Sequence, residues 1–158
     1  MTLNGRRIEV DAPSETTLFE LLHGHLALTG TKLACARGEC GACSVLLDGA
    51  TAYSCLTLAA GCSGMSVVTV EGLAPPGSLT ALQRAFVAHD ATQCGYCTPG
   101  QLIAAHALLA DNPHPSDEEI REAMSGNLCR CGTYPKILTA IRAVARGEFA
   151  DDRSARAP

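Results

Sequence analysis

The sequence predicts an α+β fold in two domains, residues 1–76 and residues 77–158. In the first half, apolar and polar residues alternate around dipeptides that favour β-hairpins, a pattern typical of strands. In the second half, apolar residues recur at helical spacing. Between the halves, the stretch 72–78 contains Pro75-Pro76-Gly77 and indicates a linker. A chain of 158 residues with 47% hydrophobic residues is large enough for two small cores.

Two hairpins and one helix are expected in the first half. Their turns lie at Asn4-Gly5 and Asp48-Gly49, which are strong signals for two-residue turns. Leucines at helical spacing predict an amphipathic helix over residues 16–26, which we expect to pack on the sheet. The expected strands are residues 2–3, 6–10, 44–47, 50–54 and 65–70. A small mixed sheet crossed by one helix, in this order of elements, is similar to the β-grasp fold of plant-type ferredoxins.

Everything after the linker is expected to be helical. Ser116-x-x-Glu119 is a capping box that starts one helix, and Pro135 precedes another. The expected helices are residues 79–89, 99–110 and 116–124, with a fourth that follows Pro135. Because these helices are short and closely connected, we expect them to form an antiparallel four-helix bundle.

Four cysteines of the first domain have the spacing of a plant-type 2Fe-2S site, C-x4-C-x2-C followed by a distant fourth cysteine. Gly38 and Gly41 lie within this run and allow the backbone to fold tightly, with N–H groups close to the negative charge of a cluster. Structural zinc sites favour pairs of C-x2-C knuckles, so zinc fits this spacing poorly. The sequence therefore predicts a 2Fe-2S cluster bound by Cys35, Cys40, Cys43 and Cys55.

A second set of cysteines lies at two predicted helix N-termini in the second domain. One pair precedes Pro99 and the other precedes Pro135. Helix N-termini favour an anionic centre, and Arg130, which lies between two of the cysteines, would offset part of its charge. A thioredoxin-like dithiol does not explain the second pair, whereas zinc remains an alternative at this site. We expect a second 2Fe-2S cluster here, bound by Cys94, Cys97, Cys129 and Cys131.

Composition excludes several classes of protein. A net charge of −4 and a pI near 5.7 leave no basic face for nucleic acid, so we expect a protein partner. No run of about 20 apolar residues is present, so no membrane span is expected. The N-terminus lacks the apolar segment of a secretory signal, which together with the cysteines favours the reducing cytoplasm. Cys62 lies outside both sets and is expected to be a small core residue, and no side chain suggests acid–base catalysis.

Three motifs together resemble the small iron-sulfur subunit of the xanthine oxidase family of molybdenum hydroxylases. They are the C-x4-C-x2-C run of residues 35–43, Gln-Cys-Gly-Tyr-Cys-Thr-Pro-Gly at 93–100, and Gly-Asn-Leu-Cys-Arg-Cys at 126–131. The resemblance implies a hetero-oligomer with a large subunit that carries molybdopterin cytosine dinucleotide and oxidises aldehydes or N-heterocycles. This chain would pass electrons from the pterin through the second cluster to the first. It also implies that Gln93 contacts the pterin and that Cys131 is the cluster ligand nearest to it.

The electron acceptor is the part of this interpretation that the sequence leaves open. The family more often has Cys-Arg-Cys-Thr-Gly-Tyr, whereas this chain has Cys131-Gly132-Thr133-Tyr134, which is similar to a branch with two-subunit isoquinoline-type enzymes. Such enzymes lack a flavin subunit. The acceptor is therefore either an FAD subunit or an external acceptor such as a cytochrome. Two other functions are alternatives: a free-standing carrier with two clusters, and a two-site zinc module without redox function.

Overall fold

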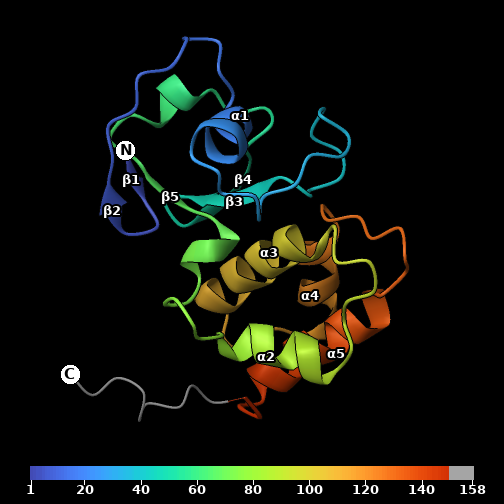
Figure 1. Cartoon of the computed structure of the whole chain (residues 1–158). Coiled ribbons are helices and arrows are strands. Elements are labelled where there is room, and N and C mark those ends of the chain that lie inside the picture. The colour runs from blue at the N-terminus through green and yellow to red at the C-terminus, as the bar shows by residue number, and fades with distance from the viewer. Residues whose placement is uncertain (150–158) are drawn as a thin grey trace, which may run out of the picture.

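The computed structural model of the chain describes residues 1–149 and confirms the α+β class (Figure 1). Five strands form one sheet in the order β2-β1-β5-β3-β4, in which β1 and β5 run parallel and the other neighbours antiparallel. The strands are β1 (Thr2–Leu3), β2 (Arg6–Arg7), β3 (Ser44–Leu47), β4 (Ala50–Tyr53) and β5 (Ser66–Val68). The sheet thus belongs entirely to the first half of the chain.

Both predicted hairpin turns are present. The four turn residues of Asn4-Gly5 and Asp48-Gly49 have φ between 48° and 87°, the left-handed values that a type I′ turn requires. The prediction of a strand over residues 6–10 was too long. β2 ends at Arg7 because its neighbour β1 offers only two residues for pairing. The last strand is also shorter than expected, since the chain enters the 3-10 helix η3 (Val70–Gly72) soon after it.

One helix covers the sheet, as predicted from residues 16–26. It begins as α1 (Leu18–Glu20) and continues as the π-helix η1 (Leu21–His25). Thr17 caps its N-terminus, because the Thr17 hydroxyl accepts the N–H of Glu20 while the Glu20 carboxylate accepts the N–H of Thr17 at 2.8 Å. Leucines of this helix pack with Val45 and Val67 of the sheet in a common core. The 3-10 helix η2 (Ala59–Cys62) adds Cys62 to the same core.

Four helices follow the linker. They are α2 (Ala81–Ala88), α3 (Thr98–Asp111), α4 (Asp117–Met124) and α5 (Tyr134–Ala145). The predicted capping box at Ser116 starts α4, and a proline lies in the first turn of both α3 and α5. Leu82, Ile120 and Ile141 are buried in the core that the helices share. The second expected domain extends to residue 158, of which residues 150–158 lie outside the described part.

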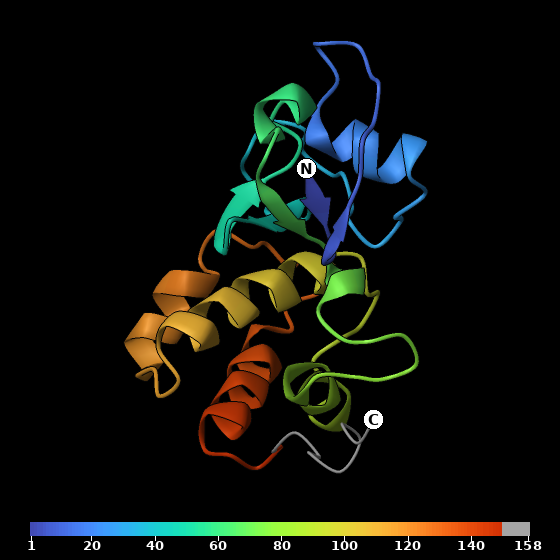
Figure 2. The same ribbon diagram turned by 90° about the vertical axis from the view of Figure 1, so that its left-hand side faces the viewer.

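The two halves of the chain are in contact. In Figures 1 and 2, α3 lies directly beside the sheet, while α2 and α5 lie on the far side of α3. This arrangement brings the N-terminal end of α3, which carries one cysteine pair, toward the loop that precedes β3. Within residues 1–149, no helix is long and apolar enough to cross a membrane.

Candidate functional site

Four cysteines lie together in the first half, and we call them the first cysteine site: Cys35, Cys40, Cys43 and Cys55. Three of them come from the loop between η1 and β3, and Cys55 follows β4. All four are free thiols. The sulfur atoms of Cys43 and Cys55 are 3.3 Å apart, and the thiols of Cys35 and Cys40 are hydrogen-bonded. The site therefore consists of two neighbouring thiol pairs.

The loop of the first cysteine site folds back on itself as the glycines predicted. Gly38 and Gly41 have φ of 79° and 66°, and Ala36, which the sequence did not single out, also has a left-handed φ of 54°. The N–H of Glu39 consequently points at the Cys35 sulfur, 3.4 Å away. The N–H groups of Arg37 and Glu39 favour the thiolate and lower the pKa of Cys35 to about 6.

Burial has the opposite effect deeper in this site. It raises the pKa of Cys43 to about 11, and the neighbouring Cys55 thiol contributes to this rise. A metal ligand must be a thiolate, and a bound cation reverses the effect of burial because it stabilises the negative charge. The first cysteine site thus offers both a half-buried, readily ionised thiol, Cys35, and a buried thiol, Cys43, that a bound metal would hold deprotonated.

The second cysteine site consists of Cys94, Cys97, Cys129 and Cys131. Cys97 is the N-cap residue of α3, and the other pair lies between α4 and α5. The thiols again form two pairs, Cys94 with Cys131 and Cys97 with Cys129. Each pair takes one member from each segment. The sequence predicted that the two segments meet, and the structure brings them together.

Two side chains that follow Cys131 hold the Cys129 position, and neither was predicted from the sequence. The Thr133 hydroxyl lies 3.2 Å from the Cys129 sulfur, and the Tyr134 hydroxyl accepts the N–H of Cys129 at 2.7 Å. Burial acts to raise the pKa of Cys129, but hydrogen bonds from Thr133, Cys97 and Cys131 together outweigh it and lower the pKa to about 7. Only the Thr133 contact depends on the Gly132-Thr133 order, because tyrosine has the same position in the commoner Cys-Thr-Gly-Tyr order.

Burial and neighbouring groups shift the pKa values of Cys97 and Cys94 in opposite directions. Burial and the adjacent Cys129 raise the pKa of Cys97 to about 12. The N–H of Tyr96 and the thiol of Cys131 lower the pKa of Cys94, which is exposed. Arg130, expected to offset charge between the two ligands, is exposed on the surface.

The pairing of the thiols bears on which metal group fits. Within residues 1–149, no three His, Cys, Asp or Glu side chains converge as ligands of one metal ion. A structural zinc ion needs four ligands around one centre, with Zn–S distances of about 2.3 Å. A 2Fe-2S cluster instead divides four thiolates between two irons. Two pairs of free thiols at each site therefore fit a 2Fe-2S cluster better than they fit zinc.

The two cysteine sites are joined by direct hydrogen bonds. The N–H of Leu128, next to Cys129, donates to the carbonyl of Cys40 at 2.9 Å. The Tyr96 hydroxyl, between Cys94 and Cys97, donates to the carbonyl of Leu33 at 2.7 Å. Each bond connects the loop of one site to the loop of the other. The sites are therefore neighbours in space although the first and second cysteine motifs lie far apart in the sequence.

Gln93 was predicted to contact a pterin, and Cys131 was predicted to be the cluster ligand nearest to it. Gln93 is exposed beside Cys94, and its side chain makes no hydrogen bond within residues 1–149. Cys131 is half-buried. Cys62, by contrast, is fully buried in the core of the first half, away from both sites.

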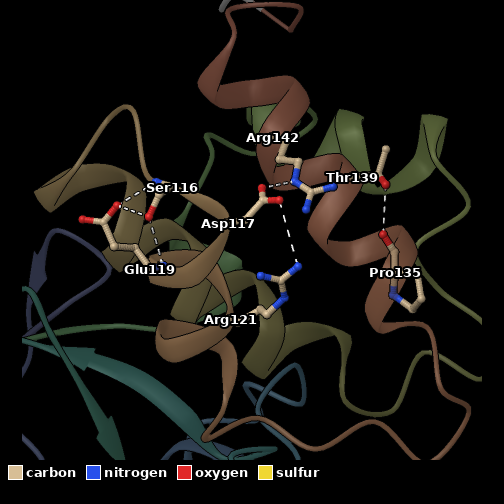
Figure 3. Close-up of polar contacts among 7 residues, drawn as sticks. All are labelled: Ser116, Asp117, Glu119, Arg121, Pro135, Thr139 and Arg142. Atoms are coloured by element: carbon tan, nitrogen blue, oxygen red, sulfur yellow. Dashed lines mark hydrogen bonds and ion pairs between the residues drawn. The ribbon is translucent and has the colours of Figure 1, made fainter.

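A groove of about 610 Å³ lies between α4 and α5, and Tyr134 connects it to the second cysteine site. Arg121 and Arg142 line it, and Figure 3 shows both of them directed at Asp117. Arg142 donates to one carboxylate oxygen of Asp117, and Arg121 lies 4.0 Å from the other. Both arginines are thus already paired. The Arg142–Asp117 pair ties α5 to α4, whereas the Arg121–Asp117 pair lies within α4.

Two family models match the chain, one for each half. Residues 1–63 match a model described as "2Fe-2S iron-sulfur cluster binding domain", and residues 69–142 match one described as "[2Fe-2S] binding domain". These matches cover all four cysteines of each site.

Relatives and solved structures match the chain over nearly its whole length. It is 46% identical over 145 residues to one subunit of the nicotinate dehydrogenase of Pseudomonas putida, covering 92% of each chain. It is 47% identical to the alpha subunit of isoquinoline 1-oxidoreductase from Brevundimonas diminuta, covering 91% of this chain and 95% of that one. A chain of quinoline 2-oxidoreductase from Pseudomonas putida 86 superposes with a TM-score of 0.89 at 46% identity, covering 96% of this chain and 94% of that one.

Proposed function

Because this chain belongs to the small 2Fe-2S subunits of molybdenum hydroxylases of the xanthine oxidase family, we propose that it carries two clusters and links a molybdenum subunit to an electron acceptor. It is the non-catalytic iron-sulfur subunit of such an oxidoreductase complex. The first cluster would belong to a ferredoxin-like domain of residues 1–76. The second would belong to a four-helix-bundle domain of residues 77–158.

The observation that carries this proposal is the pairing of eight free thiols into two neighbouring sites. Each site supplies four sulfur ligands as two pairs, which suits two irons. The Cys129 N–H is already bound by Tyr134, and the Cys35 sulfur already accepts the N–H of Glu39. The protein therefore orients these ligands with its own hydrogen bonds. The N–H of Glu39, which donates to a sulfur, would also stabilise the negative charge of a reduced centre.

The partner proposed for this chain is a large subunit with molybdopterin cytosine dinucleotide. When bound, the clusters would accept electrons from that pterin and release them to a flavin subunit or an external acceptor. Gln93 is exposed and Cys131 is half-buried at the second cysteine site, where a pterin of a partner could approach. The substrate class would be N-heterocycles or aldehydes, as the names of relatives suggest.

The acceptor would be an external protein, and not a flavin subunit, if this chain functions as its isoquinoline-type relatives are expected to. The Gly132-Thr133-Tyr134 order and 47% identity to the isoquinoline 1-oxidoreductase chain favour this alternative. A cytochrome is then the class of acceptor that we expect. An FAD subunit that copurifies with the complex would decide in favour of the other alternative.

Metal analysis of the chain, purified together with its partner subunit, tests the proposal. We expect four irons and four acid-labile sulfides per copy of this chain, and two distinct signals in electron paramagnetic resonance (EPR) after reduction. Two irons per fully loaded chain would contradict it. A colourless protein that contains zinc would favour the zinc module, and red-brown protein without a large subunit would favour a free-standing carrier.

A further inference from the structure

The two halves of the chain approach each other most closely at three glycines beside the cysteine sites. A Cβ atom on Gly41 would overlap the carbonyl oxygen of Gly126, and a Cβ on Gly100 would overlap the carbonyl oxygen of Gly41. A Cβ atom on Gly126 would overlap the Tyr53 hydroxyl, which donates to the carbonyl of Gly126 at 3.2 Å. Backbone therefore approaches backbone closely at this contact, and glycine leaves room for it because it has no Cβ.

Two buried amides hold this contact together. Asn127 donates its amide to the carbonyl of Gly41 at 2.9 Å and also reaches the Ser44 hydroxyl at 3.3 Å. Gln101 donates its own amide to the carbonyl of Asn127 at 2.7 Å. Gln101 is fully buried, and Asn127 is 5% exposed. We call Gln101 and Asn127 the amide clamp.

The amide clamp connects the segments that carry the cysteines but does not touch any sulfur. Gly41 follows Cys40 directly, and Asn127 precedes Cys129 by two residues. Gln101 lies one helical turn after Cys97, and its N–H donates to the carbonyl of Cys97 at 3.0 Å. One chain of hydrogen bonds thus runs from the α3 end of the second cysteine site, through Asn127, to the loop of the first.

We propose that Gln101 and Asn127 are positioning residues that fix the distance between the two cysteine sites, and with it the ease of electron exchange between them. This inference rests on the proposed function. The clamp makes and breaks no covalent bond and moves no proton, and a single electron passes from one site to the other. Because electron exchange falls steeply with distance, a small displacement of the Cys129 segment from the Cys40 segment would slow it.

The carbonyl of Gly41 does not depend on Asn127 alone for hydrogen bonds. Gly41 already receives two hydrogen bonds from Ser44, from its N–H at 3.1 Å and its hydroxyl at 2.7 Å. Its carbonyl would therefore remain satisfied without Asn127, and the first cysteine site could form by itself. What Asn127 adds is a bond that crosses between the halves, so its loss should affect the placement of the sites more than their formation.

Asn127→Ala tests the proposal in the full chain with its clusters. This variant removes both cross-links of the Asn127 amide, leaves no charge near the sites, and leaves Gly41 with its two donors. Two reduced clusters are paramagnetic, and the magnetic splitting of their EPR signals depends on their separation and relative orientation. We expect this splitting to narrow or disappear in Asn127→Ala, while iron and sulfide remain at the wild-type content. Ser125→Ala is the control, because Ser125 donates only to Glu122 within the same segment.

A second variant covers the case in which Asn127→Ala does not assemble. Gln101→Met removes the donor to the Asn127 carbonyl and keeps an unbranched side chain of similar length, so a smaller change of the splitting is expected. Loss of a cluster in both variants would overturn the proposal, because the amides would then serve to form the sites. A splitting in the variants that is the same as in the wild-type chain, with only the melting temperature lowered, would also overturn it. So would the absence of any magnetic splitting in the EPR spectrum of the wild-type chain. Fewer than four irons in the wild-type chain would instead reject the proposed function itself.

Discussion

The hydroxyl of Tyr134 accepts the backbone N–H of Cys129 at 2.7 Å, and this bond ties the start of α5 to a cysteine that precedes it by five residues. Thr133 meanwhile contacts the sulfur of the same residue. The backbone and the side chain of Cys129 are therefore each held by a hydroxyl from the first residues of α5. The Thr133 contact gives the Gly132-Thr133 order a structural role that does not depend on the identity of the electron acceptor.

Tyr134→Phe should destabilise the second half of the chain by about 1–3 kcal/mol, because the N–H of Cys129 would lose its acceptor in a position with 7% exposure. Iron content should stay at the wild-type value, since no sulfur ligand changes. Thermal unfolding followed by circular dichroism measures the effect. Tyr96→Phe is the control, because the carbonyl of Leu33 that Tyr96 contacts is exposed enough for water to replace the hydroxyl. Equal losses in the two variants would contradict the role of the buried N–H.

Gly100→Ala should destabilise the protein, although alanine normally favours a helix. Gly100 lies in the first turn of α3, where a Cβ would overlap the carbonyl oxygen of Gly41. We expect a loss of about 1–3 kcal/mol, the usual cost of overpacking. Gly24→Ala is the matched control, since Gly24 is exposed in η1 with open space around the position of its Cβ. The free energy of unfolding of Gly24→Ala should rise by about 0.5–1 kcal/mol. A similar rise in Gly100→Ala would contradict the prediction, because the two halves could then separate at this contact without cost.

Replacement of single cysteines should distinguish ligands from core residues. Cys40→Ala should lose one cluster, half of the iron, and the stability that the metal adds to the first half. Cys62→Ala should keep both clusters, because Cys62 is fully buried among apolar residues away from both sites. Its cost should be on the order of 1 kcal/mol, from the loss of a small buried side chain. Iron lost from Cys62→Ala would require a new assignment of the ligands.

Local signals in the sequence predicted the elements but not the lengths of the strands. Asn4-Gly5 and Ser116-x-x-Glu119 specify a turn and a helix start within a few residues, and the structure confirms both. The end of β2 could not be predicted, since it depends on how many residues its partner β1 offers. Strand ends are set by pairing, which a local pattern does not contain.

The same distinction applies to the candidate site. Cysteine spacing predicted both sets of four, because the cysteines of each set are concentrated in short stretches of the sequence. It did not predict the contact of Asn127 with Gly41 or of Leu128 with Cys40, which join residues more than 80 positions apart. The role of Gly100 could not be predicted for the same reason. A glycine in the first turn of a helix gives no local signal of a close contact, and here the contact is with the carbonyl of Gly41.

Gln93 is the residue through which we expect a partner's pterin to be recognised. Its backbone directly precedes Cys94, and its exposed carboxamide has no partner within the described residues 1–149. A carboxamide both donates and accepts hydrogen bonds, as does the edge of a pterin ring. If Gln93 were an ordinary surface residue, substitution would change stability by no more than about 0.5 kcal/mol and would leave function intact.

Gln93→Ala should therefore leave the chain and its clusters unchanged but weaken their connection to molybdenum. We expect the wild-type iron content and an intact complex, with lower molybdenum content or slower bleaching of the clusters after mixing with the N-heterocycle or aldehyde that the complex oxidises. The reason is that a hydrogen-bond partner is lost at a cofactor edge that the complex buries. Glu118→Ala, which changes an exposed side chain of α4, serves as the control. Full molybdenum content together with an unchanged rate of bleaching would reject Gln93 as a contact and leave Cys131 as the residue of this chain expected nearest to the pterin.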